Sequence, residues 1–231
     1  MPLSFLEIIM SLRDIKHPTI IHCNISDAND TIVSNAGTSY TRVIALNRFN
    51  RSNIAFSILV ESLKGFNVAS ETLDMTLQES DLPDGTFSDV SGKSITQIAG
   101  NGSFPTLTTI KVNSSSSVSP LLPYVRLKIV VAAQPTNKAV TSFTKAGDVI
   151  TMAVSDGDND HFVVGDSVVV SGATTGGNNG TFIITGVNTT LNTITYTNAS
   201  GASEAGGSAI FKFAASAYGY NTRVVAQTSG A

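Results

Sequence analysis

The sequence has little charge, and this shortage excludes several classes of protein. Charged residues make up 13% of the 231 residues, whereas about 25% is usual in globular domains. The 14 basic side chains are outnumbered by 17 acidic ones, so the chain lacks the excess of positive charge that marks proteins binding nucleic acid or an anionic membrane surface. We therefore expect neither nucleic acid nor a membrane as a partner.

Cysteine is also scarce, since Cys23 is the only one. A single cysteine excludes an intrachain disulfide and any metal or redox site built on paired cysteines. Its neighbour His22 would project from the opposite face of a strand, so the two cannot act together as a nucleophile and its base. The other histidines, His17 and His161, are dispersed. With no catalytic cluster in view, we expect no enzymatic activity and no cofactor.

The N-terminal segment has an apolar stretch that is too short to cross a bilayer and that Glu7 interrupts. It also lacks the basic region and the small-residue cleavage site of a secretory signal. We expect synthesis in the cytosol without export, and we assign residues 1–17 to an N-terminal arm. Met10 is a second plausible start, which leaves open whether translation begins at Met1 or at Met10.

Short β-rich runs recur from residue 19 onward, and helical periodicity is hard to find. In YVRLKIVV, for example, Arg126 and Lys128 fall on one face of a strand while Val125, Leu127 and Ile129 fall on the other. Such alternation at these intervals is typical of two packed antiparallel sheets. We predict an all-β protein whose residues 18–134 form an antiparallel, jelly-roll-like β-sandwich.

A second, smaller antiparallel β module is predicted over residues 141–214, Ig-like or barrel-like in form. Apolar periodicity stops across AAQPTNKAVTS, which favours a linker at 135–140. We expect the C-terminal segment, residues 215–231, to be a strand or a tail. Its Tyr218 to Val225 segment is too apolar for a solvated end, so we expect it to pair with the first domain or with a neighbouring subunit. Pairing with the first domain would make the module an insertion in one long sandwich.

Three segments resemble virion proteins of tailed phages. Residues 162–199 are similar to their small β modules, with β-branched runs such as VVVSGA and TFIIT separated by the turn TTGGNNG. TLQESDLPDGTFSDV (76–90) and LPYVRLKIVVA (122–132) resemble strands of jelly-roll capsid cement, or decoration, proteins that stabilise the head. The resemblance implies a structural protein on the capsid surface of the virion, assembled in the cytoplasm of a bacterial host. Its implied partner is the major capsid protein, and its implied state is a homo-oligomer, dimer or trimer.

An alternative from another class is a tail or fibre adsorption protein whose small β module binds a host-surface glycan. Sugar sites commonly use aromatic platforms, but the chain has no tryptophan. The module has few aromatic residues, and we expect several of them to be buried in its core.

The best metal candidates are Asp156, Asp158 and Asp160 in the run DGDND, because alternate carboxylates in a loop can converge on a hard cation. The calcium-loop template then fails, since its glycine position falls on His161 and its glutamate position on Ser167. Asp27, Asn29 and Asp30 in SDAND are a weaker second candidate, which turn propensity explains. A solvated acidic turn between strands is the interpretation we adopt, with no metal site.

Two groups of residues are candidates for a protein interface. One lies in RVIALNRFNR and the other in the C-terminal segment, and both combine arginine with aromatic side chains, as interface hot spots do. A solvated strand end is the competing interpretation of the first group. The candidate interface residues are Arg42, Arg48, Phe49, Arg51, Tyr218, Tyr220 and Arg223.

Overall fold

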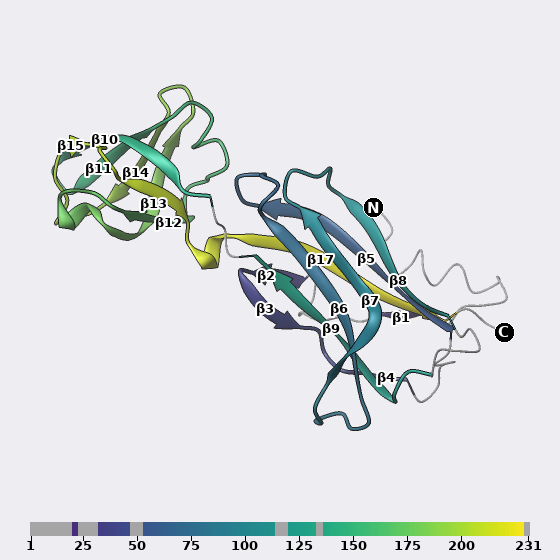
Figure 1. Ribbon diagram of the computed structural model, residues 1–231. Coiled ribbons are helices and arrows are strands. Elements are labelled where there is room, and N and C mark those ends of the chain that lie inside the picture. Colours follow the sequence, from purple (N-terminus) through teal and green to yellow (C-terminus); the bar gives the residue numbers. More distant parts are fainter. Residues whose placement is uncertain (1–19, 23–31, 47–52, 114–119, 133–135, 229–231) are drawn as a thin grey trace, which may run out of the picture.

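The computed structural model describes residues 20–22, 32–46, 53–113, 120–132 and 136–228, and these form two β units (Figure 1). The predicted N-terminal arm lies outside the described residues. Strands dominate both units, which confirms the all-β prediction. The larger unit is a sandwich of two antiparallel sheets, and the smaller one is a barrel.

Each sheet of the sandwich has five strands. The first sheet contains β1 (Ile20–His22), β2 (Ile32–Asn35), β5 (Asn53–Lys64), β8 (Thr106–Asn113) and β17 (Gly219–Thr228). The second sheet contains β3 (Gly37–Tyr40), β4 (Ile44–Ala45), β6 (Thr72–Ser80), β7 (Ser88–Ala99) and β9 (Tyr124–Val131).

The order of these strands is that of a jelly roll. One sheet runs β1/β2, β17, β5, β8, and the other runs β3/β4, β9, β6, β7. From β4 onward, every connection within the sandwich except the β6–β7 hairpin passes from one sheet to the other, as in the double Greek key of this architecture. The jelly-roll-like sandwich predicted for the first domain is therefore confirmed.

Alternating side chains build the core between the two sheets. In β9 the residues Val125, Leu127, Ile129 and Val131 are buried, and the intervening ones are not. The strand period of two produces this pattern because it sends successive side chains to opposite faces. Each such burial contributes about 1.5–3 kcal/mol, so the interior faces of β5, β6 and β9 hold the sandwich together.

The barrel consists of strands that follow β9 in the sequence. They are β10 (Lys138–Ala146), β11 (Val149–Val154), β12 (Ser167–Ser171), β13 (Gly180–Asn188), β14 (Thr193–Thr197), β15 (Glu204–Ala205) and β16 (Ile210–Phe213). Six of them close in the order β10, β11, β14, β13, β12, β16 and back to β10, while β15 pairs with β10 outside this ring. Closure depends on a bulge between Val140 and Ser142, where β10 leaves β16 and turns toward β11. Of the two forms predicted for the module, the structure shows a barrel.

The barrel is inserted into the sandwich. Strand β9 ends before the barrel and β17 begins after it, and β17 pairs with β5 from Gly219–Lys64 to Thr228–Ile54. The segment from Tyr218 to Val225 therefore returns to the first unit. Strand β10 begins at Lys138, inside the stretch predicted as linker. The sequence does not indicate a strand there, because the first residues of β10 lack apolar alternation.

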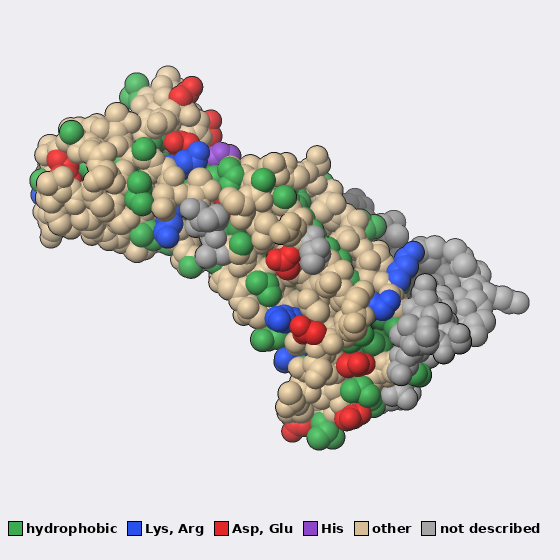
Figure 2. Space-filling model, viewed as in Figure 1, with side chains coloured by type: hydrophobic (Ala, Val, Ile, Leu, Met, Phe, Trp, Pro, Cys, Tyr) green, Lys and Arg blue, Asp and Glu red, His purple; other side chains and the backbone are tan. Residues whose placement is uncertain are grey.

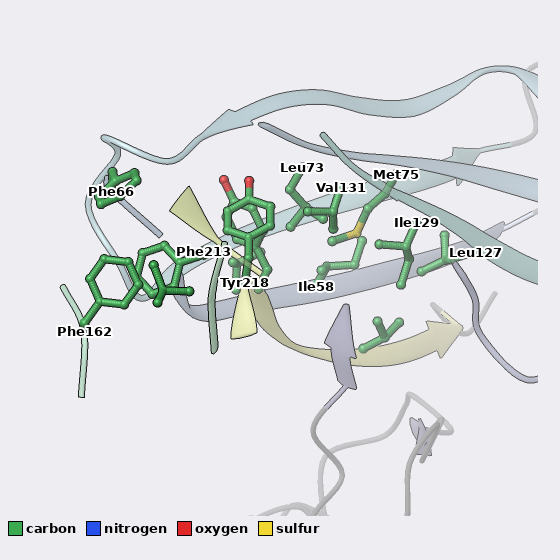
Figure 3. Close-up of a cluster of buried hydrophobic side chains, with 14 of the residues drawn as sticks. Ile58, Phe66, Leu73, Met75, Leu127, Ile129, Val131, Phe162, Phe213 and Tyr218 are labelled. Atoms are coloured by element: carbon green, nitrogen blue, oxygen red, sulfur yellow. The ribbon is translucent and has the colours of Figure 1, made fainter. Parts of the chain in front are cut away.

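Phe66, in the loop between β5 and β6, joins the two units. Its ring centroid lies 5.2 Å from that of Phe213, 5.8 Å from Phe162 and 6.1 Å from Phe211, all three in the barrel. Figure 3 shows this aromatic group at one end of the buried cluster that continues into the sandwich. The barrel is thus attached by side-chain packing as well as by its two chain connections.

Polar contacts surround this aromatic joint. Lys64 Nζ lies 2.7 Å from Asp166 Oδ2, an ion pair that spans the two units. Inside the sandwich, the buried carboxylate of Glu71 accepts the backbone N–H of Phe66 at 2.9 Å and that of Val68 at 3.3 Å. Glu71 therefore fixes the loop that presents Phe66 to the barrel.

Candidate interaction surface

The first predicted interface group falls largely outside the described residues. Arg48, Phe49 and Arg51 lie there, so only Arg42 of this group can be placed. Arg42 is exposed and lies between β3 and β4, at the edge of the second sheet.

The predicted interface role of Tyr218 and Tyr220 is wrong. Both rings are core residues, exposed by 1% and 0%, and the Tyr220 hydroxyl donates to the carbonyl oxygen of Glu71 at 2.8 Å. Burial, reinforced by the negative charge of Glu71, raises the pKa of both hydroxyls well above the usual value for tyrosine. The reason for Tyr220 is topological: β17 lies between β5 and the β1/β2 pair, so its inward side chains complete the core, and Tyr218 is buried just before the strand begins.

Arg223 projects from the other face of β17. Its Nε lies 3.0 Å from Oε1 of Glu61 on the neighbouring strand β5, and both side chains are about one third exposed. Arg223 was grouped with Tyr218 and Tyr220 as a candidate interface residue. In the structure Arg223 is partly exposed, whereas the two tyrosines are buried in the core.

The acidic run at 156–160 anchors a turn. Asp158 Oδ1 lies 2.7 Å from Lys138 Nζ, whereas Asp156 and Asp160 are exposed. Asn159 is fully buried and donates through Nδ2 to the carbonyl oxygen of Asn188 at 2.9 Å. In the described part of the chain, no three His, Cys, Asp or Glu side chains are grouped so that they could hold a metal ion.

A surface that sequence analysis did not identify lies on the outer face of the second sheet. Arg126 of β9 projects from this face, and its guanidinium carbon lies 4.0 Å from the ring centroid of Tyr40 and 4.3 Å from that of Phe87. A guanidinium held over aromatic rings gains cation–π attraction and keeps its planar fork in a fixed orientation. We call Tyr40, Arg126 and Phe87 the Arg126 stack.

Polar side chains beneath the Arg126 stack fix it further. Arg126 Nε donates to Gln78 Oε1 at 2.8 Å, and Gln78 Nε2 donates to Asp89 Oδ1 at 2.6 Å. Gln78 is only 6% exposed, and Lys128 Nζ lies 3.7 Å from the other oxygen of Asp89. The hydrogen bonds from Arg126 to Gln78 and from Gln78 to Asp89 therefore orient the guanidinium before any partner binds, which lowers the entropy cost of binding.

The Arg126 stack is partly open to solvent, since Tyr40 is exposed and Arg126 and Phe87 are half-buried. Tyr40 is 48% exposed, and no described residue accepts a hydrogen bond from the two terminal nitrogens of Arg126. These N–H groups can bind a carboxylate or a backbone carbonyl of a partner, and arginine and tyrosine are enriched in interface hot spots. On the face of the molecule in Figure 2, basic and acidic side chains are interspersed on the sandwich, so a precise local contact rather than a broad field would select the partner.

The sequence predicts the outward position of Arg126 but not the presence of its aromatic partners. Alternation in YVRLKIVV already placed Arg126 on the solvent face of its strand. Its aromatic partners come from β3 and from the loop before β7, both distant in sequence, and only the order of strands in the sheet brings them together.

Comparison with known proteins identifies no relative: no family model, no curated protein and no solved structure matches the chain. Among the described residues, no helix has the length and apolar character needed to cross a membrane.

Proposed function

We propose that the protein is a decoration, or cement, protein of a tailed-phage virion, which binds the outer surface of the assembled head and bridges neighbouring major capsid subunits. The Arg126 stack carries the proposal, because it is a preformed arginine and aromatic group on the outer face of one sheet of a jelly roll. Jelly rolls are widely used in viral capsids, which supports the proposal by analogy of fold.

In this proposal the sandwich is the anchor and the barrel projects from it. The aromatic joint at Phe66 supports such an arrangement, because it fastens the barrel to one end of the sandwich. A dimer or trimer would engage several capsid subunits at once. Once one subunit is bound, the effective concentration of the others near their sites is high, so several weak contacts give strong overall binding. Such binding needs no catalytic group.

Co-sedimentation with phage heads tests the proposal. The purified protein is mixed with expanded heads that lack it, and with unexpanded proheads and isolated tails for comparison. Saturable binding to expanded heads alone, at a fixed number of copies per major capsid subunit, is the expected result. Binding to tails but not to heads would overturn the proposal.

A pair of variants ties head binding to the Arg126 stack. Arg126→Ala should weaken binding about thirtyfold, which corresponds to the loss of a hot spot of about 2 kcal/mol. Lys111→Ala removes an exposed cation from β8 on the opposite sheet and should leave binding unchanged. If both variants bind like the unmodified protein, the Arg126 stack is not the contact.

The alternative, an adsorption protein whose barrel binds a glycan, gains less support. Among the described barrel residues, the large exposed apolar side chains are aliphatic. The aromatic ones pack inward or at the joint, as Phe182 does when it stacks on buried Tyr196 at 4.4 Å. The barrel therefore offers a sugar no exposed aromatic platform within its described surface.

A further inference from the structure

A groove of about 430 Å³ opens on the sandwich near the end of β5, far from the Arg126 stack in the fold. Its volume falls within the range of about 300–1,000 Å³ that is usual for small-ligand sites. The groove lies between the β5–β6 loop and the β7–β8 loop, and the last residues of β5 form its floor.

A β-bulge shapes the floor of the groove. Strand β5 pairs Val60 with Thr222 and Ser62 with Asn221, so Glu61 is an extra residue opposite β17. Because a bulge shifts the alternation of side chains by one, Glu61 and Ser62 both lie on the outer side, where they line the groove. Bulges are over-represented next to active sites, where they redirect side chains in this way.

Two loops form the walls of the groove. Asn67 and Asn101 are exposed there, and Asn67 holds a left-handed backbone conformation with φ of 55°. Gly100 lets the walls approach closely, because a Cβ at this position would lie 2.9 Å from the carbonyl oxygen of Val68 in the other loop. Phe104 closes one side, with its ring centroid 5.9 Å from that of buried Tyr220.

The groove has polar groups but little net charge. Among the described residues that line it, Glu61 is the only ionisable one, and Arg223 at 3.0 Å balances its negative charge. The side-chain amides of Asn67 and Asn101 can each donate and accept hydrogen bonds. This combination suits hydroxyl groups, which also do both, better than it suits phosphates or metal ions.

We propose that this groove binds a neutral saccharide. The amides of Asn67 and Asn101 and the carboxylate of Glu61 would bind its hydroxyl groups, and the ring of Phe104 would contact an apolar edge of the sugar. The site differs from a sugar site on the barrel, because all of these residues belong to the jelly roll.

Nuclear magnetic resonance on the ¹⁵N-labelled full chain tests the site. Glucose, galactose and N-acetylglucosamine are titrated separately, with sodium phosphate as an anionic control. At least one sugar should shift the side-chain amide signals of Asn67 and Asn101 in a saturable way, while phosphate should not. If no sugar shifts these signals, or if phosphate shifts them at lower concentration than every sugar, the proposal is wrong.

Two variants from one loop sharpen the test. Asn101→Ala removes a proposed ligand and should weaken sugar binding about fivefold, as expected for one lost hydrogen bond. Ser103→Ala changes an exposed neighbour that does not line the groove, and should bind like the unmodified protein. Equal sugar affinity in both variants would overturn the assignment. Because the groove and the Arg126 stack are separate, Asn101→Ala should bind phage heads normally.

Discussion

At the scale of single residues, Tyr218, which comes just before β17, and Tyr220, within β17, are both buried but differ in hydrogen bonding. Tyr220 donates its hydroxyl to the carbonyl oxygen of Glu71, while the hydroxyl of Tyr218 has no partner among the described residues. Tyr220→Phe should lower the free energy of unfolding by about 1 kcal/mol, the usual net value of a hydrogen bond. Tyr218→Phe should change it by less than about 0.5 kcal/mol, because it removes only an unpaired polar group. Urea unfolding followed by circular dichroism measures both, and equal losses would contradict the assignment.

Buried tyrosines should also make the protein sensitive to alkali. Burial raises the pKa of Tyr196, Tyr218 and Tyr220, so the folded chain retains protons that the unfolded chain loses above about pH 10. Below that pH the three hydroxyls are protonated in both states and do not affect stability. Above it, each should lower the free energy of unfolding by about 1.4 kcal/mol per pH unit. Urea unfolding measured on both sides of pH 10 tests this, and Tyr218→Phe should show a shallower decline.

Residues differ in how far the sequence reveals their roles. The outward position of Arg126 follows from strand alternation alone. The same segment-level reasoning failed for Tyr218 and Tyr220, because arginine and aromatic residues mark both interfaces and cores. Burial depends on which strand lies beside β17, and no local pattern contains that information.

At the scale of elements, glycine decides how closely β15 approaches β10. Gly206 donates its N–H to the carbonyl oxygen of Thr141, and a Cβ at Gly206 would overlap the carbonyl oxygen of Val140. Gly206→Ala should therefore force the backbone apart and lower the free energy of unfolding by about 2 kcal/mol or more.

Gly176 provides the matched control in the same barrel. It begins the short helix η2 (Gly176–Asn178), and a Cβ there would meet nothing within 4 Å. Gly176→Ala should change stability by no more than about 0.5 kcal/mol. Thermal unfolding of both variants tests the comparison, and a small effect of Gly206→Ala would show that β15 can move without loss.

Element boundaries were predictable where alternation is strong. YVRLKIVV contains β9 entirely, and its apolar residues are the ones that the structure buries. Prediction failed at β10, whose first residues were assigned to a linker. That strand is held by pairing with β16 and by a bulge that turns it toward β11, and both depend on partners distant in sequence.

At the scale of the whole molecule, the insertion of the barrel raises the question of how rigidly two units can be joined. The pairing of β17 with β5 ties the end of the barrel back to the sandwich. Phe66 then adds a contact that neither unit makes alone, because its ring belongs to the sandwich and its aromatic neighbours belong to the barrel. The sequence raised the possibility of an insertion but contained no signal for this joint, since Phe66 lies in a loop between two strands of the other unit.

Shortening the side chain of Phe66 should loosen the joint. Phe66 is only 4% exposed, so Phe66→Ala should lower the free energy of unfolding by about 3 kcal/mol through the lost burial and the cavity left behind. Because the cavity lies between the units, the barrel and the sandwich should then melt as two separate transitions in differential scanning calorimetry.

The control for this prediction is Phe66→Leu, which keeps most of the apolar volume and should retain a single transition. Small-angle X-ray scattering adds a readout of shape: Phe66→Ala should give a larger radius of gyration than Phe66→Leu, because the barrel is released from a fixed orientation. Identical melting and scattering of the two variants would mean that the chain connections and the ion pair of Lys64 with Asp166 are sufficient to hold the units. If Phe66→Ala still binds heads through the Arg126 stack, anchoring in the proposed decoration protein depends on the sandwich alone, and the joint serves only to orient the barrel.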